Sequence, residues 1–305
     1  MRRTSQIASI ITLALIFVST VTRPIPAETT NAGETTPASM RIGLTGSLFR
    51  DLPDALLQVV MRPFRAVMEE QTGLSGTLVS VKDASLLAQQ LQNNQVQLGV
   101  FHSHEFAWLK AKNPNLTPLM FAVNSKQPLE SMVVIRQDCT ITDVPGLSGK
   151  TVLLPKSVRE TTHLFANRRC TLVGKPLRKY CEVKVVNDSD DALDQLVDRQ
   201  ADAAVVEKHQ WEAFKEDKPG RSNQLKIVLS SEVFPPAVIA YIPGNLQKDA
   251  VERFRQGMLQ AKNNRRAADL LQLVRITSFE PVPEAYEMTL ANLLKDYPLS
   301  IEESK

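Results

Sequence analysis

Residues 97–108, QLGVFHSHEFAW, hold the pattern that decides the fold. The apolar run at 98–101 predicts a short buried strand, and the polar triplet His-Ser-His at 102–104 leads into a predicted helix. In an open α/β sheet, ligands bind beyond the carboxyl ends of the strands, where turns of this kind lie. The stretch therefore predicts an α/β protein with a candidate ligand site at this turn.

The same pattern recurs 105 residues further along the chain. The offset relates six identical pairs and one aromatic pair: Val81 and Val186, Asp83 and Asp188, Leu91 and Leu196, Gln95 and Gln200, Val100 and Val205, His104 and His209, and Phe106 and Trp211. Several matches at one offset indicate two similarly built α/β halves. The spacing is too long for a short solenoid repeat.

Strands and helices are predicted to alternate through both halves, which favours parallel sheets. Predicted strands at 131–136 and 237–243 bracket the second half. If both cross between the halves, the C-terminal helices rejoin the first lobe. The chain would then have two lobes, a paired hinge and a cleft that closes by hinge bending.

The first 27 residues have the layout of a secretory signal peptide. Two arginines precede an apolar core at 7–21, and Ile-Pro-Ala follows at 25–27. The core is short for a membrane span, which needs about 20 apolar residues. We therefore expect export to the periplasm, with a signal peptide at 1–27 and a flexible leader at 28–39. An uncleaved membrane anchor is the alternative.

Composition and charge weaken a nucleic-acid function. The 305 residues are 43% hydrophobic and 23% charged, as in ordinary globular proteins, and the length suits two domains. The formal charge of +3 includes Arg2, Arg3 and Arg23 of the signal segment, without which 33 basic and 33 acidic residues remain. The totals give no basic face that would attract nucleic acid.

The helix starts that follow predicted strands favour small anions. Helix N-termini present unpaired N–H groups and a partial positive charge, and nearby hydroxyls and arginines add donors. The candidate ligand-binding residues are Thr45, Ser47, Arg50, His102, Ser103, His104, Ser131, Arg159, Glu160, Thr161, Thr162 and Glu207. For the serines and threonines, the alternative role is helix capping. For the arginines, the alternative is a solvated side chain that contacts no ligand. Glu160 either stabilises a helix start or binds a ligand amine.

Metal binding and catalysis have less support. His102, His104, Glu105, His163 and His209 raise a metal hypothesis, but their spacing matches no specific motif. The chain has no G-x-S-x-G, H-E-x-x-H, Walker or G-x-G-x-x-G motif. We therefore predict a binding protein without catalytic residues, metal or cofactor. A hydrolase and a metal binder remain as alternatives.

Three cysteines in an exported chain permit at most one intramolecular disulfide. Cys170 and Cys181 flank a predicted loop between a helix and a strand, so they are the favoured pair. Cys139 would then be a lone thiol. Three unpaired, apolar cysteines are the alternative.

Five segments together carry a resemblance to a known family: MRIGLT at 40–45, LLAQQLQNNQVQLGVF at 86–101, SMVVIRQD at 131–138, LSGKTVLLP at 147–155 and DALDQLVDRQADAAVV at 191–206. In order and spacing they resemble the periplasmic substrate-binding proteins of ABC transporters, of the phosphate/phosphite/phosphonate-binding type. The resemblance implies a type 2 periplasmic-binding-protein fold. That is an α/β fold of two lobes, each a mainly parallel sheet flanked by helices, joined by two crossing strands.

Three positions depart from the pattern of the family it resembles. Arg-Glu-Thr-Thr at 159–162 replaces a small-residue turn that grips the phosphonate, His102 and Ser103 replace a Gly-Pro-like turn, and Glu130 stands where an aromatic residue is common. The resemblance therefore implies the fold and leaves the ligand open between a small anion and a zwitterion.

The predicted domain organisation is a first lobe at 40–130, a second lobe at 131–236, and a return to the first lobe with C-terminal helices at 237–305. We expect a monomeric, exported solute-binding protein that captures a small, phosphonate- or phosphate-like oxyanion between its lobes and delivers it to an ABC permease. A periplasmic sensor or partner-binding module without a transporter is the alternative.

Overall fold

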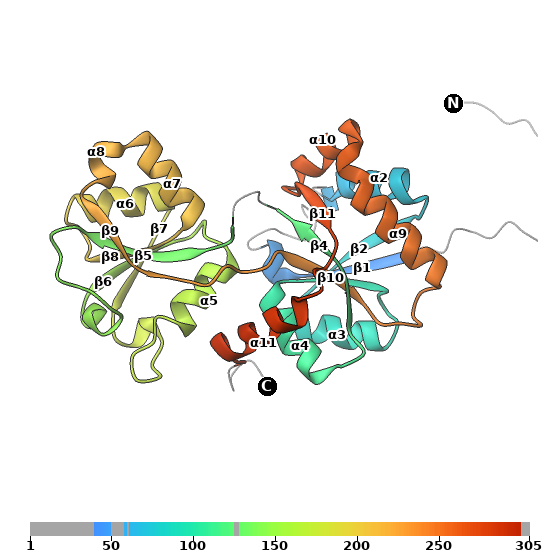
Figure 1. The fold of residues 1–305 in the computed structure, drawn as a ribbon, viewed down its shortest axis with the longest axis horizontal. Coiled ribbons are helices and arrows are strands. Elements are labelled where there is room, and N and C mark those ends of the chain that lie inside the picture. The colour runs from blue at the N-terminus through green and yellow to red at the C-terminus, as the bar shows by residue number, and fades with distance from the viewer. Residues whose placement is uncertain (1–39, 50–57, 60, 125–127, 300–305) are drawn as a thin grey trace, which may run out of the picture. The chain divides into compact units, whose positions relative to one another are not determined.

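The computed structural model describes residues 40–49, 58–59, 61–124 and 128–299, which form two α/β lobes (Figure 1). The predicted signal peptide and leader lie outside the described residues, as does Arg50. Within the part described, no helix is both long and apolar enough to cross a bilayer.

The first lobe has a six-stranded sheet in the order β11-β4-β10-β3-β1-β2. Its strands are β1 (Met40–Thr45), β2 (Gly76–Val81), β3 (Leu98–Phe101), β4 (Thr117–Val123), β10 (Ala237–Tyr241) and β11 (Ser278–Glu280). β1 runs parallel to β2 and β3, and β10 runs antiparallel to β3 and β4. Strands β1 to β4 therefore point the same way, as the alternating pattern predicts.

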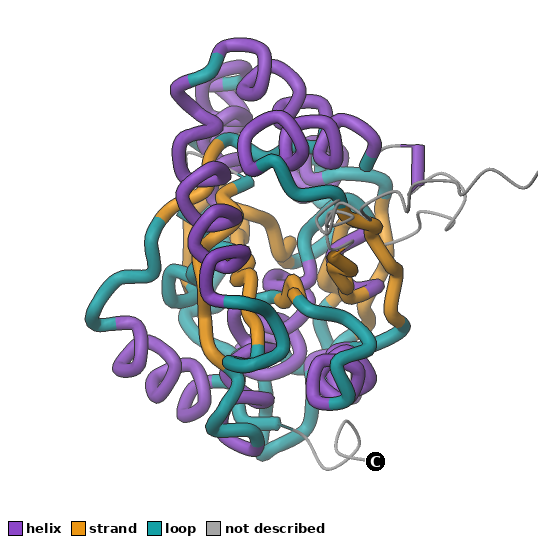
Figure 2. The backbone as a smooth tube through the Cα atoms, turned by 90° about the vertical axis from the view of Figure 1, so that its right-hand side faces the viewer, coloured by secondary structure: helices purple, strands orange, loops and turns teal. Residues whose placement is uncertain are grey.

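Two layers of helices cover this sheet (Figure 2). Phe64, Phe254 and Leu271 pack on one face. They come from α2 (Arg62–Thr72), α9 (Lys248–Gln260) and α10 (Arg265–Leu273). The other face is covered by α3 (Ala84–Gln92), α4 (Ser103–Lys112) and α11 (Tyr286–Asp296). The short 3-10 helices η1 (Gly46–Phe49) and η4 (Ala261–Asn263) add Leu48 and Ala261 to the cluster on the first face. Burying one apolar stripe of each helix stabilises the lobe.

The second lobe has a five-stranded sheet in the order β7-β6-β8-β5-β9. The strands are β5 (Ser131–Arg136), β6 (Thr151–Pro155), β7 (Glu182–Val186), β8 (Ala203–Glu207) and β9 (Leu225–Ser230). Only β5 runs against the other four. The helical segments are η2 (Pro145–Leu147), α5 (Glu160–Arg168), η3 (Leu177–Lys179), α6 (Ser189–Val197), α7 (Lys208–Asp217) and α8 (Pro219–Ser222). Helix α5 covers one face, and α6 and α7 cover the other.

The predicted internal repeat is confirmed at the level of whole elements. Helices α3 and α6 begin and end 105 residues apart, and so do α4 and α7. Asp83 and Asp188 cap α3 and α6 in the same way, each accepting a hydrogen bond from the backbone N–H three residues on. In both sheets one antiparallel strand, β10 or β5, lies beside the third parallel strand.

The connections between the lobes differ from the prediction in one respect. The strands predicted to cross between the lobes each belong to a single sheet, β5 to the second and β10 to the first. β5 pairs on both edges within its own sheet, so its backbone groups are satisfied there. The two connecting segments instead meet at one isolated antiparallel bridge, where the Phe234 N–H donates to the Leu129 carbonyl at 2.8 Å.

Candidate oxyanion site

In the first lobe, hydrogen-bond donors converge on the carboxylate of Glu105. The Thr45 hydroxyl donates to it at 3.2 Å, the Ser47 hydroxyl at 2.7 Å and the His102 backbone N–H at 3.0 Å. These groups meet because β1 pairs with β3, so that the turn after β1 lies beside the start of α4. Glu105 is only 8% exposed. The arrangement is a donor set built around a buried oxyanion.

The first turn of α4 adds further buried polar groups. Ser103 and His104 are 1% and 3% exposed. Neither the Ser103 Oγ nor the His104 Nδ1 has a hydrogen-bond partner among the described residues. The rings of His102 and His104 stack with centroids 5.4 Å apart, and Trp108 meets His104 edge-on at 5.0 Å. Burial lowers the pKa of His104 well below its usual value, and the charges of His102 and Arg168 lower it further. His104 is therefore a neutral group at pH 7.

In the second lobe, donors converge on Glu207, which ends β8 and is 4% exposed. The Arg159 backbone N–H donates to it at 2.5 Å, the Arg159 guanidinium pairs with it at 3.1 Å, and the Thr162 hydroxyl lies 3.5 Å away. His209 Nδ1 is 3.2 Å from the same carboxylate. Burial lowers the pKa of His209, Glu207 opposes this effect, and Arg159 adds to it. Arg159 is thus the main counter-charge of Glu207.

Ser131 extends this second donor set. Its hydroxyl lies 2.8 Å from that of Thr162, and its backbone N–H donates to the Ser231 hydroxyl at 2.9 Å. Ser131 and Thr162 are both almost fully buried. The contact ties the start of β5 to the first turn of α5.

Most of the predicted ligand residues fall into these two groups. Thr45, Ser47, His102, Ser103 and His104 lie at the first, and Ser131, Arg159, Thr162 and Glu207 lie at the second. Glu160 and Thr161 begin α5 beside the second group.

The sequence reasoning missed the centre of the first group. Glu105 entered only as a possible metal ligand, although it stands three residues after the N-cap of α4, where a carboxylate commonly accepts from the N-cap backbone N–H. The three-residue spacing between His102 and Glu105 predicts this capping role. The approach of Thr45 and Ser47, 60 and 58 residues away in sequence, comes only from the pairing of β1 with β3.

The predicted disulfide between Cys170 and Cys181 is wrong: both are free thiols, as is Cys139. Cys170 and Cys181 pack in one apolar cluster, where the Cys181 thiol donates to the Leu147 carbonyl at 3.0 Å. Burial raises the pKa of Cys170 to about 12 and that of Cys181 to about 11. Disulfide exchange needs a thiolate, which these surroundings disfavour.

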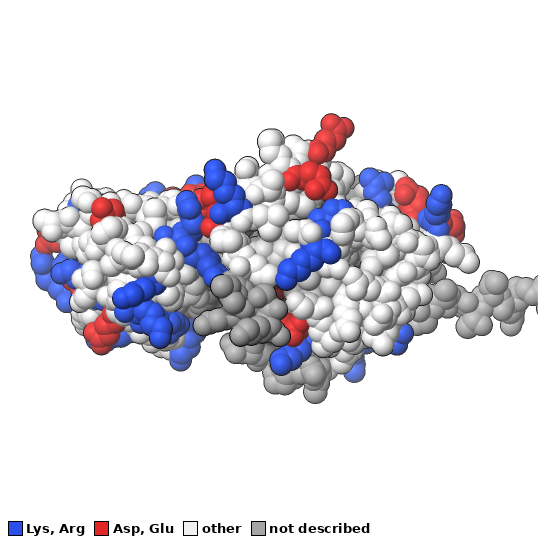
Figure 3. All heavy atoms as spheres, turned by 90° about the horizontal axis from the view of Figure 1, so that it is seen from below, with Lys and Arg blue, Asp and Glu red and all other residues white. Residues whose placement is uncertain are grey.

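The described residues contain no group of three or more His, Cys, Asp or Glu side chains placed to hold a metal ion. The histidines of the two donor sets contact an aromatic ring or a single carboxylate instead. On the face seen in Figure 3, basic and acidic side chains lie in small groups, several of them mixed, with uncharged surface between the groups.

Comparison with known proteins places the chain in a family. The sequence profile of the ABC transporter, phosphonate, periplasmic substrate-binding protein family matches residues 51–286. No curated protein matches the chain by sequence.

Solved structures share the fold at low sequence identity. A Xanthomonas citri protein bound to ATP is 16% identical with a TM-score of 0.60, covering 86% of this chain and 99% of its own. A binding-protein component of an ABC phosphonate transporter from Pseudomonas aeruginosa is 14% identical with a TM-score of 0.54, covering 87% of this chain and 91% of its own. A Prochlorococcus marinus protein in complex with methylphosphonate is 12% identical with a TM-score of 0.55, covering 85% of this chain and 98% of its own.

These neighbours have the two-lobed fold of type 2 periplasmic binding proteins, which confirms the predicted fold class. The family match spans more than three quarters of the sequence. The chain belongs to the periplasmic substrate-binding proteins of phosphonate ABC transporters.

Proposed function

We propose that the protein captures a small phosphorus oxyanion of the phosphonate or phosphate class between its lobes and delivers it to an ABC permease. Residues 40–130 and 237–305 form the first lobe in this proposal, and residues 131–236 form the second. Capture proceeds by hinge bending about the segments that meet at Leu129 and Phe234. Residues 1–27 direct export to the periplasm.

One observation carries the proposal. Each lobe gathers hydroxyl and backbone N–H donors at the start of a helix and directs them at a buried carboxylate. A phosphonate presents the same kind of acceptor as a carboxylate, with one more oxygen, so the same donors fit it. Arg159 adds a cation with the forked geometry that oxyanions favour.

We infer that binding occurs without chemical turnover. The family to which the chain belongs is a substrate-binding component of a transporter. The hydroxyls of Ser131 and Thr162 hydrogen-bond to each other, and that of Thr45 donates to Glu105, so all three hydroxyls are engaged in hydrogen bonds. The solute would leave unchanged, and the permease would be the next partner.

Calorimetric titration of the mature chain, from Glu28, tests the proposal. Methylphosphonate and inorganic phosphate are the probes, with sulfate and acetate for comparison. We expect saturable binding of a phosphorus oxyanion, and a ligand at 100 times its Kd raises the free energy of unfolding by about 2.7 kcal/mol. Folded protein that binds none of these anions contradicts the proposal.

The variant Arg159→Ala locates the site. It removes the cation that lies against the second donor set, and we expect the affinity for methylphosphonate to fall by about tenfold or more. Arg178→Ala is the matched control, because Arg178 is an exposed arginine of the same lobe on η3. Equal affinities of the two variants would remove Arg159 from the site.

A further inference from the structure

Both donor sets of the candidate site are already engaged by carboxylates of the chain itself. Glu105 accepts from Thr45, Ser47 and the His102 N–H. Glu207 accepts from the Arg159 N–H and pairs with its guanidinium. Any oxyanion that uses these donors therefore has to compete with Glu105 or Glu207.

The two carboxylates occupy related places in the two lobes. Glu105 lies in the first turn of α4, directly after β3, and Glu207 is the N-cap of α7, at the end of β8. β3 with α4 and β8 with α7 are the elements related by the 105-residue offset. Each carboxylate receives donors from the end of β1 or from the turn after β1 or β6, and these two strands are the first of the successive parallel strands β1, β2, β3 and β6, β7, β8. Both lobes therefore place a buried carboxylate against the hydrogen-bond donors at the start of a helix.

Helix capping alone does not account for the number of donors that each glutamate accepts. Capping α4 requires only the bond between Glu105 and the His102 N–H, yet the hydroxyls of Thr45 and Ser47 also donate to Glu105. Glu207 likewise accepts from the Arg159 N–H and the Thr162 hydroxyl at the start of α5, although Glu207 itself ends β8 and precedes α7. In both lobes the carboxylate takes donors well beyond those of its own helix.

Binding of a ligand cation by these glutamates is also disfavoured by the geometry. The Glu105 carboxylate accepts three hydrogen bonds and is 8% exposed, and Glu207 is 4% exposed against Arg159. A carboxylate so engaged has few lone pairs left for an ammonium group. What remains complementary to each donor set is another anion.

We infer that Glu105 and Glu207 are resident anions, which hold the two donor sets until an incoming oxyanion displaces at least one of them. The inference rests on the proposed function and adds a control on affinity and selectivity. A solute with more oxygens and more charge than a carboxylate displaces the glutamate, whereas a monocarboxylate such as acetate gains little over it. The apparent affinity of the wild type is reduced by the fraction of protein in which the glutamate stays bound.

The test compares Glu207→Gln and Glu105→Gln with the wild type in calorimetric titrations with methylphosphonate and inorganic phosphate. Each substitution removes the resident charge while keeping the side-chain size. We expect the affinity for methylphosphonate to rise by about tenfold in at least one of the two variants. Glu207→Asp is the third displacement variant, because it keeps the charge but shortens the side chain away from the Arg159 N–H. Its affinity is also expected to rise.

Glu130→Gln is the matched control. Glu130 pairs at 2.7 Å with Lys208, the residue that follows Glu207 in sequence. This variant therefore makes the same change of charge nearby without releasing a donor of the site. Its affinity is expected to stay within about twofold of the wild type, because the Glu130 carboxylate pairs with Lys208 and salt weakens the effect of a charge at a distance.

The outcomes separate the inference from the proposed function. Wild-type binding with unchanged or lower affinity in all three displacement variants overturns the inference and leaves oxyanion binding intact; lower affinity points to a ligand cation held by the glutamates. If Glu130→Gln raises the affinity for methylphosphonate as much as the displacement variants do, the change in net charge alone explains the effect, and the inference is also overturned. If neither the wild type nor any variant binds these anions, and the proteins have a normal circular dichroism spectrum, the proposed function itself is overturned.

Discussion

His104 is a residue whose protonation chemistry changes strongly on folding. Its ring is buried between His102 and Trp108, and the burial lowers its pKa well below the usual value. The charges of His102 and Arg168 act in the same direction. In the unfolded chain His104 takes up a proton near pH 6.5, whereas in the folded chain it stays neutral to lower pH. The unfolded state therefore binds more protons as the solution becomes acidic, and folding stability falls.

At the residue scale we predict that His104→Gln removes this acid sensitivity. The contribution of His104 is fully present above pH 6.5 and decreases by about 1.4 kcal/mol per pH unit below it. Urea unfolding at pH 7.5, 6.0 and 5.0 measures the effect, and the wild type should lose more unfolding free energy than the variant over that range. His209→Gln is a control of smaller effect, because Glu207 opposes the lowering of the His209 pKa. Parallel pH profiles of wild type and His104→Gln would contradict the prediction.

Sequence could find the polar positions of the site but not their partners. Thr161 and Thr162 were both candidates and both are buried, yet it is the Thr162 hydroxyl that contacts Ser131 and lies 3.5 Å from Glu207. The choice depends on where α5 lies on the sheet, which is set by tertiary packing. For the same reason, the convergence of Thr45 on Glu105 needed the register of β1 against β3.

At the scale of elements, the repeat was readable because the same local rules act twice. Asp83 and Asp188 are N-caps followed by apolar residues at helical spacing, so sequence alone indicates α3 and α6. The three-residue strand β11 was not predicted, because so short a segment has no period of its own and is defined by pairing with β4. The membership of β5 and β10 in single sheets was missed, since a uniformly apolar strand does not reveal its neighbours.

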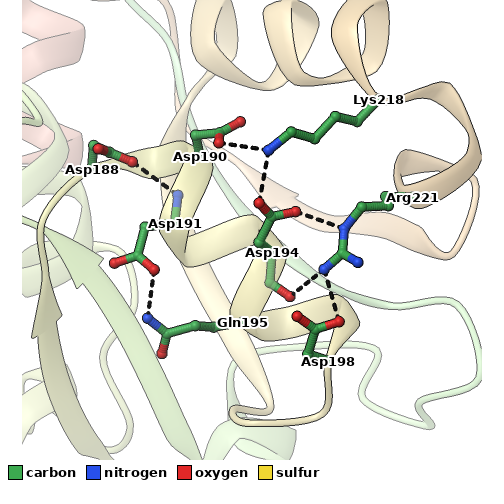
Figure 4. Close-up of polar contacts among 8 residues, drawn as sticks. All are labelled: Asp188, Asp190, Asp191, Asp194, Gln195, Asp198, Lys218 and Arg221. Carbon is green, nitrogen blue, oxygen red and sulfur yellow. Dashed lines mark hydrogen bonds and ion pairs between the residues drawn. The ribbon is translucent and has the colours of Figure 1, made fainter.

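Helices α6, α7 and α8 are joined by a network of charges at the surface of the second lobe (Figure 4). Lys218, directly before α8, pairs with Asp190 at 2.6 Å and with Asp194 at 2.7 Å. Arg221 of α8 pairs with Asp194 at 2.6 Å and with Asp198 at 2.8 Å. Asp194 is shared by both cations and is the centre of the network.

At the element scale we predict that Asp194→Asn lowers the free energy of unfolding by about 1 kcal/mol at low salt, and by less at 0.5 M NaCl, because these pairs are partly exposed and screened. Glu212→Gln is the control: Glu212 pairs only with Lys215 of its own helix among the ion pairs described, and its loss should cost about 0.3 kcal/mol. Denaturant unfolding at both salt concentrations measures the difference. An Asp194→Asn effect no larger than that of Glu212→Gln would show that the network adds nothing beyond an isolated pair.

At the scale of the whole molecule, the end of the described chain is tied to both lobes. Tyr297 follows α11, is fully buried, and packs against Phe234 with ring centroids 5.0 Å apart. Its hydroxyl donates to Glu232 at 2.6 Å, and its carbonyl accepts from the Trp108 indole of α4 at 2.7 Å. Glu232 also pairs with Arg169 at 2.8 Å, directly after α5 of the second lobe. Glu232 lies between β9 and β10, in one of the segments that connect the lobes.

We therefore predict that Tyr297→Phe lowers the free energy of unfolding by about 1.5 kcal/mol, since a hydrogen bond to a charged acceptor is lost while the ring remains. Tyr286→Phe is the matched control, because the Tyr286 hydroxyl is buried and has no hydrogen-bond partner among the described residues. Removing it should leave stability unchanged or raise it. Urea unfolding of both variants at pH 7.5 measures the difference. If the two variants are equally stable, the contact between Tyr297 and Glu232 does not help to join the C-terminal end to the connecting segment.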